Sequence, residues 1–128
     1  MKRAKVWLNY RVLLVEDNAI NLLVATKLLQ KLNINAAIAV DGLEAVAMTE
    51  KAAYDLILMD MQMPNMDGLT ATQHIRAMNL SKRPTIIALT ANAMNEDQAR
   101  CLAAGMDDFI SKPIHFDQLK QTLSRFYP

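Results

Sequence analysis

Five polar residues of this sequence each stand at or just beyond the carboxyl end of an apolar run that has strand character. They are three acids, one hydroxyl and one amine: Glu16, Asp17, Asp60, Thr90 and Lys112. Carboxylates crowded together repel one another unless positive charge lies among them, and Lys112 or a divalent cation would supply that charge. All-oxygen ligands favour Mg²⁺, with Mn²⁺ as an expected substitute. A cation, a lysine and a hydroxyl in one site can hold a phosphoryl group.

Asp60 is the candidate nucleophile of such a site, because an aspartate carboxylate can form a covalent phospho-intermediate. It follows the apolar residues 56–59, whose strand we expect at the centre of the fold. A lone aspartate after a strand is more often a turn or capping residue. The pair Glu16-Asp17 before Asn18 is also compatible with a helix N-terminus, where acids are favourable. The agreement of all five positions favours the chemical interpretation.

Strand-like runs alternate with helical patterns along the chain. The expected strands are residues 11–15, 35–40, 55–59, 85–90 and 108–111, and the expected helices lie around 20–28, 43–48, 69–78, 95–104 and 116–126. Runs that are apolar on both faces favour a parallel sheet covered by helices on both sides. The order predicts an α/β fold, a (βα)₅ doubly wound five-stranded parallel sheet with right-handed crossovers. Ligands of such sheets bind beyond the carboxyl ends of the strands.

The length, net charge and composition of the chain exclude several classes of protein. The 128 residues predict one domain, 10–128, after an N-terminal linker or added segment, 1–9. A net charge of +1 implies no nucleic-acid surface, and no apolar run is long enough to span a membrane. The first residues lack the small-residue cleavage site of a signal peptide. Cys101 is the single cysteine, and we expect it to be a small buried hydrophobic residue. We expect the protein to be a monomer in the reducing cytoplasm.

Four segments resemble the receiver domains of response regulators in two-component signalling. They are "VLLVEDN" (12–18), "DLILMDMQMPNMDG" (55–68), "IIALTA" (86–91) and "GMDDFISKPI" (105–114). The resemblance covers about residues 10–126 and implies the flavodoxin-like receiver fold. The segments "MDMQMPNMDG", "ALTANAM" and "CLAAGMDDFISKPI" are most similar to receiver domains of hybrid sensor histidine kinases. Such domains exchange phosphate with a histidine phosphotransfer protein or a histidine kinase. If this chain is a fragment, the resemblance implies that its parent is a hybrid histidine kinase, of which this domain would be a cytoplasmic part.

The resemblance implies a role for each matching residue. Asp60 would accept a phosphoryl group from a phosphohistidine, and Lys112 would pair with that group. The implied Mg²⁺ ligands are Glu16, Asp17, Asp60 and the backbone carbonyl of Gln62. The implied switch residues are Thr90 and Phe109, and the peptide bond before Pro113 would be cis. Phosphorylation would then change the surface formed by residues 95–104, 108–111 and 116–126. Phe109 stands where a tyrosine or histidine is common in the family.

Two other functions stay open beside this one. A receiver-like interaction module that has lost phosphorylation usually lacks one of the five positions, and all are present here. A hydrolase of the aspartyl-phosphate type commonly carries a general acid two residues after the nucleophile, where this chain has Gln62. A DNA-binding regulator would need a further domain. We therefore expect a domain that catalyses its own Asp60 phosphorylation and slow dephosphorylation and is not a conventional enzyme.

Overall fold

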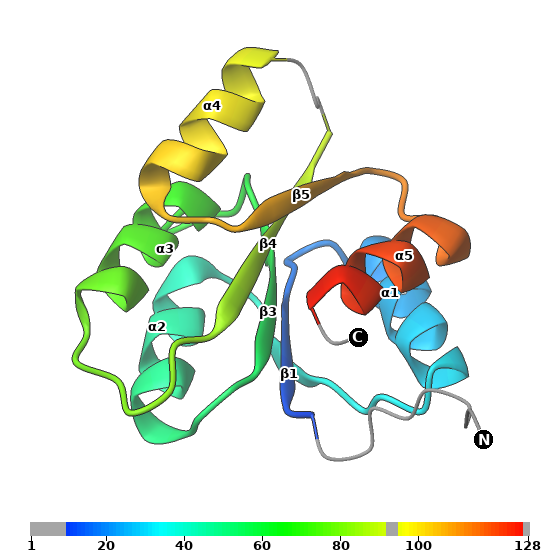
Figure 1. Cartoon of the computed structure of the whole chain (residues 1–128), viewed down its shortest axis with the longest axis horizontal. Helices are drawn as coiled ribbons and strands as arrows, with labels where there is room; N and C mark the ends of the chain where they lie inside the picture. The colour runs from blue at the N-terminus through cyan, green and yellow to red at the C-terminus, as the bar shows by residue number, and fades with distance from the viewer. Residues whose placement is uncertain (1–9, 92–94, 127–128) are drawn as a thin grey trace.

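The structure, a computed structural model, describes residues 10–91 and 95–126, so the expected linker 1–9 lies outside it. Strands and helices alternate along the chain (Figure 1). The strands are β1 (Val12–Val15), β2 (Ala37–Ala39), β3 (Leu56–Asp60), β4 (Thr85–Thr90) and β5 (Asp108–Ser111). The helices are α1 (Ala19–Lys31), α2 (Gly42–Lys51), α3 (Gly68–Ala77), α4 (Asn95–Ala104) and α5 (Phe116–Phe126). This order confirms the predicted (βα)₅ arrangement. None of the described helices combines the length and apolar character needed to cross a membrane.

The strands form one parallel sheet in the order β2-β1-β3-β4-β5, with β3 at its centre. The chain moves outward from β1 to β2 and then crosses to the other side of β1 to form β3. The strand order therefore reverses between β1 and β3. In open α/β sheets, this reversal leaves a crevice at the carboxyl ends of the two strands, where ligands bind.

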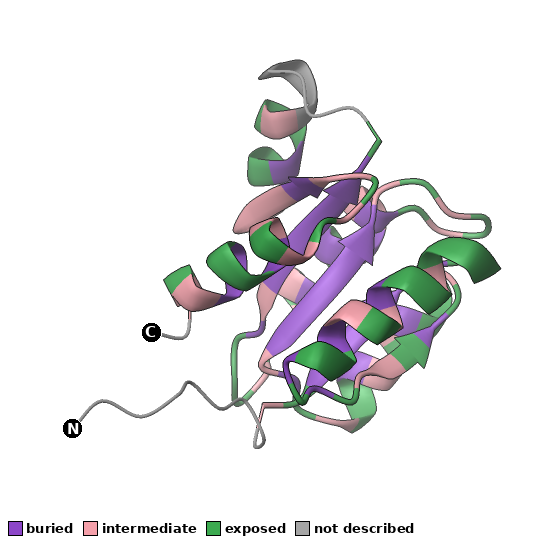
Figure 2. Cartoon of the chain, turned by 90° about the vertical axis from the view of Figure 1, so that its right-hand side faces the viewer, coloured by how far each residue is buried: buried purple, intermediate pink, exposed green. Residues whose placement is uncertain are grey.

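Helices cover both faces of the sheet, and the strands are its buried centre (Figure 2). On one face, α1 and α5 pack against residues such as Leu14, Leu58 and Leu89. On the other face, α2, α3 and α4 pack against Leu13, Ile57 and Ala88. Figure 1 shows the same division, with α1 and α5 on one side and the remaining helices on the other. Because neighbouring residues of a strand face opposite layers, both faces of each inner strand are apolar.

Two boundaries differ from the predicted ones in ways that matter for the site. Asp60 is the last residue of β3, paired in register with Leu89 of β4, so the sheet itself fixes its backbone. The predicted run 35–40 forms a strand only over Ala37–Ala39, because alanine is a poor strand former and β2 pairs on one edge alone. The helix cap of α1 is Asn18, whose side chain accepts hydrogen bonds from two backbone amides. Glu16 and Asp17 therefore precede the cap.

Candidate functional site

The parallel register brings the predicted residues to one edge of the sheet. Val15 pairs with Met59, Asp60 with Leu89, and Thr90 with Ser111. The strands β1, β3, β4 and β5 therefore end beside one another, and the residues at or after these ends become neighbours in space. The backbone amide of Lys112 donates a 2.7 Å hydrogen bond to the Thr90 carbonyl, which continues the alignment beyond β5.

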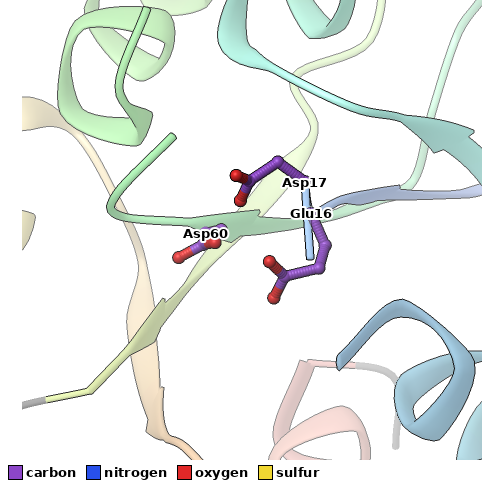
Figure 3. A group of neighbouring side chains, drawn as sticks. All are labelled: Glu16, Asp17 and Asp60. Carbon is purple, nitrogen blue, oxygen red and sulfur yellow. The ribbon is translucent and has the colours of Figure 1, made fainter. Parts of the chain in front are cut away.

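The three acids form one cluster at the ends of β1 and β3. One carboxylate oxygen from each of Glu16, Asp17 and Asp60 lies within 4.8 Å of the other two (Figure 3). Glu16 and Asp60 are each 2% exposed, whereas Asp17 is exposed. The cluster thus has two buried carboxylates that can bind a metal ion and one carboxylate that is open to water. These donors suit a hard divalent cation that keeps part of its hydration shell, which is the way Mg²⁺ binds to proteins.

Lys112 supplies the positive charge within this cluster. Its Nζ donates to Asp60 Oδ1 at 2.8 Å and lies 3.2 Å from Glu16 Oε1. Burial lowers the pKa of Lys112, but the hydrogen bond and charge of Asp60, together with the charge of Glu16, outweigh it and raise that pKa. The amine therefore stays protonated over the physiological range. The backbone amide of Gln62 also donates to Asp60 Oδ1, at 3.2 Å, so two donors orient the carboxylate.

A pocket of about 370 Å³ opens beside Asp60, toward α4. Its lining contains Asp60, Met61, Gln62, Met63, Asp67, Leu69, Thr90, Ala91, Arg100 and Lys112. Asp60 and Thr90 are almost fully buried in it, at 2% and 4% exposure. The pocket contains the predicted nucleophile, hydroxyl and lysine, and it adds Arg100, which the sequence did not single out. A phosphoryl group and part of its donor are of a size to enter such a space.

Comparison with known proteins identifies the family. The family model of the response regulator receiver domain matches residues 12–124. The chain belongs to the receiver domain family. Hybrid signal transduction histidine kinase G of Dictyostelium discoideum is 45% identical over 92% of this chain. Probable histidine kinase 1 of Oryza sativa subsp. indica is 40% identical, also over 92%. This receiver domain spans 4% and 15% of the lengths of those two relatives.

Solved receiver domains have the same fold. The receiver domain of a Pseudomonas aeruginosa sensor histidine kinase, solved with a magnesium ion coordinated in the active-site cleft, is 43% identical with a TM-score of 0.84. The match covers 91% of this chain and 96% of that one. A second structure is a complex of the Saccharomyces cerevisiae phosphotransfer protein Ypd1 with the receiver domain of Ssk1. It matches with 31% identity and a TM-score of 0.86, over 95% of this chain and 91% of that one.

The two predicted switch residues of this receiver domain lie on adjacent strands. Thr90 ends β4, and Phe109 pairs in register with Ala88, two residues before Thr90. Phe109 is half-buried and packs against the core layer beneath α3 and α4. The Lys112–Pro113 peptide bond, which the resemblance implied to be cis, is cis in the structure. Cys101 is buried, as expected of a small hydrophobe.

The loop between β3 and α3 is held by contacts that the sequence did not reveal. The Gly42 amide donates to the Met66 carbonyl at 3.1 Å, and Asn65 Nδ2 donates to Asp41 Oδ2 at 2.7 Å. Asn65 adopts a φ of 67°, in the left-handed region. The sequence indicated only a turn and helix start at Asp41-Gly42. Through these two hydrogen bonds, that turn also fixes the loop that follows Asp60, and so it helps to position Gln62.

The acid cluster predicts how the stability of the domain changes with pH. Burial, and then hydrogen bonding to Asp60, raise the pKa of Glu16 from an ordinary 4.5 to about 7. A raised carboxyl pKa gives stability that is present below pH 4.5 and is lost as the pH rises through 7. Glu16→Gln cannot ionise, so we expect it to be more stable than wild type at pH 8 by about 2 kcal/mol. At pH 5 the difference should largely vanish.

Thermal melts of both proteins in EDTA at pH 5 and pH 8 measure this difference. The chelator is needed because a bound cation would favour the ionised carboxylate. The rest of the chain is identical in the two proteins, so its contribution cancels in the comparison. A stability difference that is the same at both pH values would contradict the raised pKa of Glu16.

Proposed function

We propose that this receiver domain accepts a phosphoryl group on Asp60 from a phosphohistidine of a histidine kinase or histidine phosphotransfer protein. The observation that carries the proposal is the position of the Asp60 carboxylate. It is part of a cluster of acids suited to Mg²⁺, it pairs with the ammonium of Lys112, and it lines a pocket of about 370 Å³. An interaction module without chemistry has no need of this arrangement of buried charge, which costs folding free energy.

In the transfer, a carboxylate oxygen of Asp60 attacks phosphorus. A phosphorus–oxygen bond forms as the phosphorus–nitrogen bond of the phosphohistidine breaks. The imidazole leaves with the electron pair and takes up a proton from water. Lys112 and the Gln62 amide hold the carboxylate in place, and Lys112 also lies where it can pair with a phosphoryl oxygen.

Mg²⁺ fits the acid cluster, and when bound it supplies positive charge that offsets the charge of the phosphoryl oxygens. Asp17, Asp60 and the Gln62 carbonyl would hold the ion, with Glu16 acting through water. Two observations favour this division. Asp17 is exposed and therefore accessible to a hydrated cation, whereas Glu16 is buried and already lies 3.2 Å from Lys112. Mn²⁺, with similar oxygen ligands, is expected to substitute.

The test of the proposed function is the Mg²⁺-dependent gain of one phosphoryl group. Incubation with phosphoramidate and Mg²⁺ should add about 80 Da to the intact mass. The same incubation with EDTA should leave the mass unchanged. Absence of the added mass under both conditions, with donor in excess, would refute the proposal.

The partner would dock on exposed apolar residues of α1 next to the site. Ile20, Leu23 and Val24 are 72%, 56% and 43% exposed. Val24 also lines a small hollow together with Glu16, Lys112, Pro113 and Ile114. Because Asp60 is only 2% exposed, a protein donor must press its phosphohistidine close to the sheet edge. An apolar contact on α1 would hold it there.

Leu23→Lys should slow phosphotransfer from a protein donor at least about tenfold, which corresponds to the loss of a moderate interface contact. Its phosphorylation by phosphoramidate should stay at the wild-type rate, because a small donor needs no docking surface. Leu102→Lys is the matched control, since Leu102 is also 56% exposed but lies on α4, across the sheet. The measurement is transfer from a phosphorylated histidine phosphotransfer protein. Equal transfer rates for both variants would show that the partner does not dock on α1.

The proposal includes an output that partners can read. A phosphoryl group on Asp60 would draw the Thr90 hydroxyl toward it and leave space behind β4, which the half-buried ring of Phe109 can fill. The surface of α4, β5 and α5 would then differ between the two states, and ligands that prefer one state would shift the population. The proposed setting is a monomeric domain in the cytoplasm, where the thiol of Cys101 would stay reduced.

A further inference from the structure

Two cations line the pocket beside Asp60 among the residues that the structure describes, and they come from different elements. Lys112 follows β5, and Arg100 lies on α4. Neither Glu16 nor Asp17 is among the lining residues. Arg100 therefore belongs to the side of Asp60 that faces α4, away from the acid cluster. A phosphoryl group on Asp60 would have the acid cluster on one side and Arg100 on the other.

Lys112 is already shared between two carboxylates before any phosphoryl group arrives. Its Nζ lies 2.8 Å from Asp60 and 3.2 Å from Glu16. An incoming phosphoryl group adds further negative charge to a pocket that also contains Asp67. A single ammonium cannot pair closely with all of these oxygens. Bound Mg²⁺ would offset part of the added charge, and Arg100, which also lines the pocket, can offset more of it.

The helix carries Arg100 into the pocket at a fixed place. The next residue, Cys101, is buried, and its Sγ lies 3.5 Å from Sδ of Met61, which directly follows Asp60. This contact holds α4 against the loop that leaves β3. The side chain of Arg100 itself is exposed, so a phosphoryl donor that enters from solvent can reach it. A guanidinium presents several N–H donors in one plane, which matches two oxygens of a phosphoryl group.

We propose that Arg100 binds the phosphoryl group in this pocket, as a second side-chain cation in addition to Lys112. Its guanidinium donates hydrogen bonds to phosphoryl oxygens of the incoming donor and of phosphorylated Asp60. This role rests on the proposed function, because it concerns the same acceptor. It also connects α4 to the phosphorylated state, because the hydrogen bonds between Arg100 and the phosphoryl group form only in that state.

The experiment compares Arg100→Gln with Lys51→Gln. Both substitutions remove one positive charge from an exposed side chain, but Lys51 ends α2 and lines a different hollow. We measure the affinity for beryllofluoride at saturating Mg²⁺ and the phosphorylation rate as a function of phosphoramidate concentration. Arg100→Gln should weaken beryllofluoride binding about threefold to tenfold and raise the half-saturating donor concentration by a similar factor. Lys51→Gln should match wild type.

Mg²⁺ affinity in the absence of phosphoryl ligand separates binding from a structural effect. It should stay within about twofold of wild type in Arg100→Gln, because Arg100 lies on the other side of Asp60 from the acids. Arg100→Lys should recover part of the beryllofluoride affinity, as a cation without the planar fork. Beryllofluoride affinity equal to that of Lys51→Gln, or an equal fall in Mg²⁺ affinity, would overturn the inference. Wild type that gains no phosphoryl group would instead overturn the proposed function itself.

Discussion

Asp60→Asn should abolish phosphorylation completely while the domain stays folded. The amide oxygen of asparagine is a far weaker nucleophile than a carboxylate, and it has no negative charge to attack phosphorus. The two side chains have the same shape, so the packing at the end of β3 is kept. Lys112 keeps Glu16 as a charge partner, 3.2 Å away. Substitution also removes one of three clustered acids, so the melting temperature in EDTA should be unchanged or higher.

Intact-mass measurement with phosphoramidate and Mg²⁺ checks this prediction. Wild type should gain about 80 Da, and Asp60→Asn should gain none. Asp117→Asn is the control for the same chemical change, because Asp117 is exposed in the first turn of α5 and away from the pocket. It should be phosphorylated at the wild-type rate. Mass gain by Asp60→Asn at that rate would assign the acceptor to another residue.

Structural features that depend on short, continuous stretches of sequence could be predicted. Each inner strand is a continuous apolar run, and the acids, the hydroxyl and the lysine at the strand ends follow from parallel order alone. Once the strands are parallel, their carboxyl ends meet, so Glu16, Asp60 and Lys112 had to become neighbours. The sequence also left open whether Glu16 and Asp17 cap a helix. The structure assigns the cap to Asn18, whose side chain accepts hydrogen bonds from the Ile20 and Asn21 amides.

Contacts between segments that are far apart in the sequence could not be predicted. Arg76 donates to the Gly105 carbonyl, 29 residues away, and to Asp107, 31 residues away, so no local pattern indicates the pairing. Arg100 lines the pocket beside Asp60 because α4 packs against the loop after β3, as in the contact of Cys101 with Met61. Periodicity places a residue on a helix. It does not place the helix relative to a loop.

Gly68→Ala should destabilise the domain more than substitution at either of the other glycines, although Gly68 has no side chain that could take part in the chemistry. A Cβ at Gly68 would lie 2.1 Å from the carbonyl oxygen of Asp60 and 3.0 Å from its carbonyl carbon. Real Cβ atoms do not approach backbone so closely. Asp60 cannot move away, because its strand is paired on both sides within the sheet. The loop from Met61 to Gly68 must therefore open, and its 3.2 Å amide–carbonyl bond between those residues is lost.

We expect a loss of about 3 kcal/mol or more, as for other substitutions that overpack against backbone. For a chain of this size, the melting temperature should fall by roughly 10 °C or more. Gly105→Ala is the comparison. Gly105 has a φ of +105°, and a Cβ there would first meet Cγ of Arg76, at 2.8 Å, in a side chain that can shift. Its cost should be smaller, about 1–2 kcal/mol from backbone strain.

The same substitution should weaken the metal site, because Gly68 closes the loop that positions Gln62. Added Mg²⁺ should raise the melting temperature of wild type by binding the folded state. In Gly68→Ala that rise should be smaller, whereas in Gly105→Ala it should stay at the wild-type value, since Gly105 lies after α4 and outside the pocket lining. Thermal melts of the three proteins with EDTA and with saturating Mg²⁺ measure both effects. If Gly68→Ala has the melting temperature of wild type and the same increase with Mg²⁺, the loop can move away from Asp60 at little cost, and the prediction is wrong.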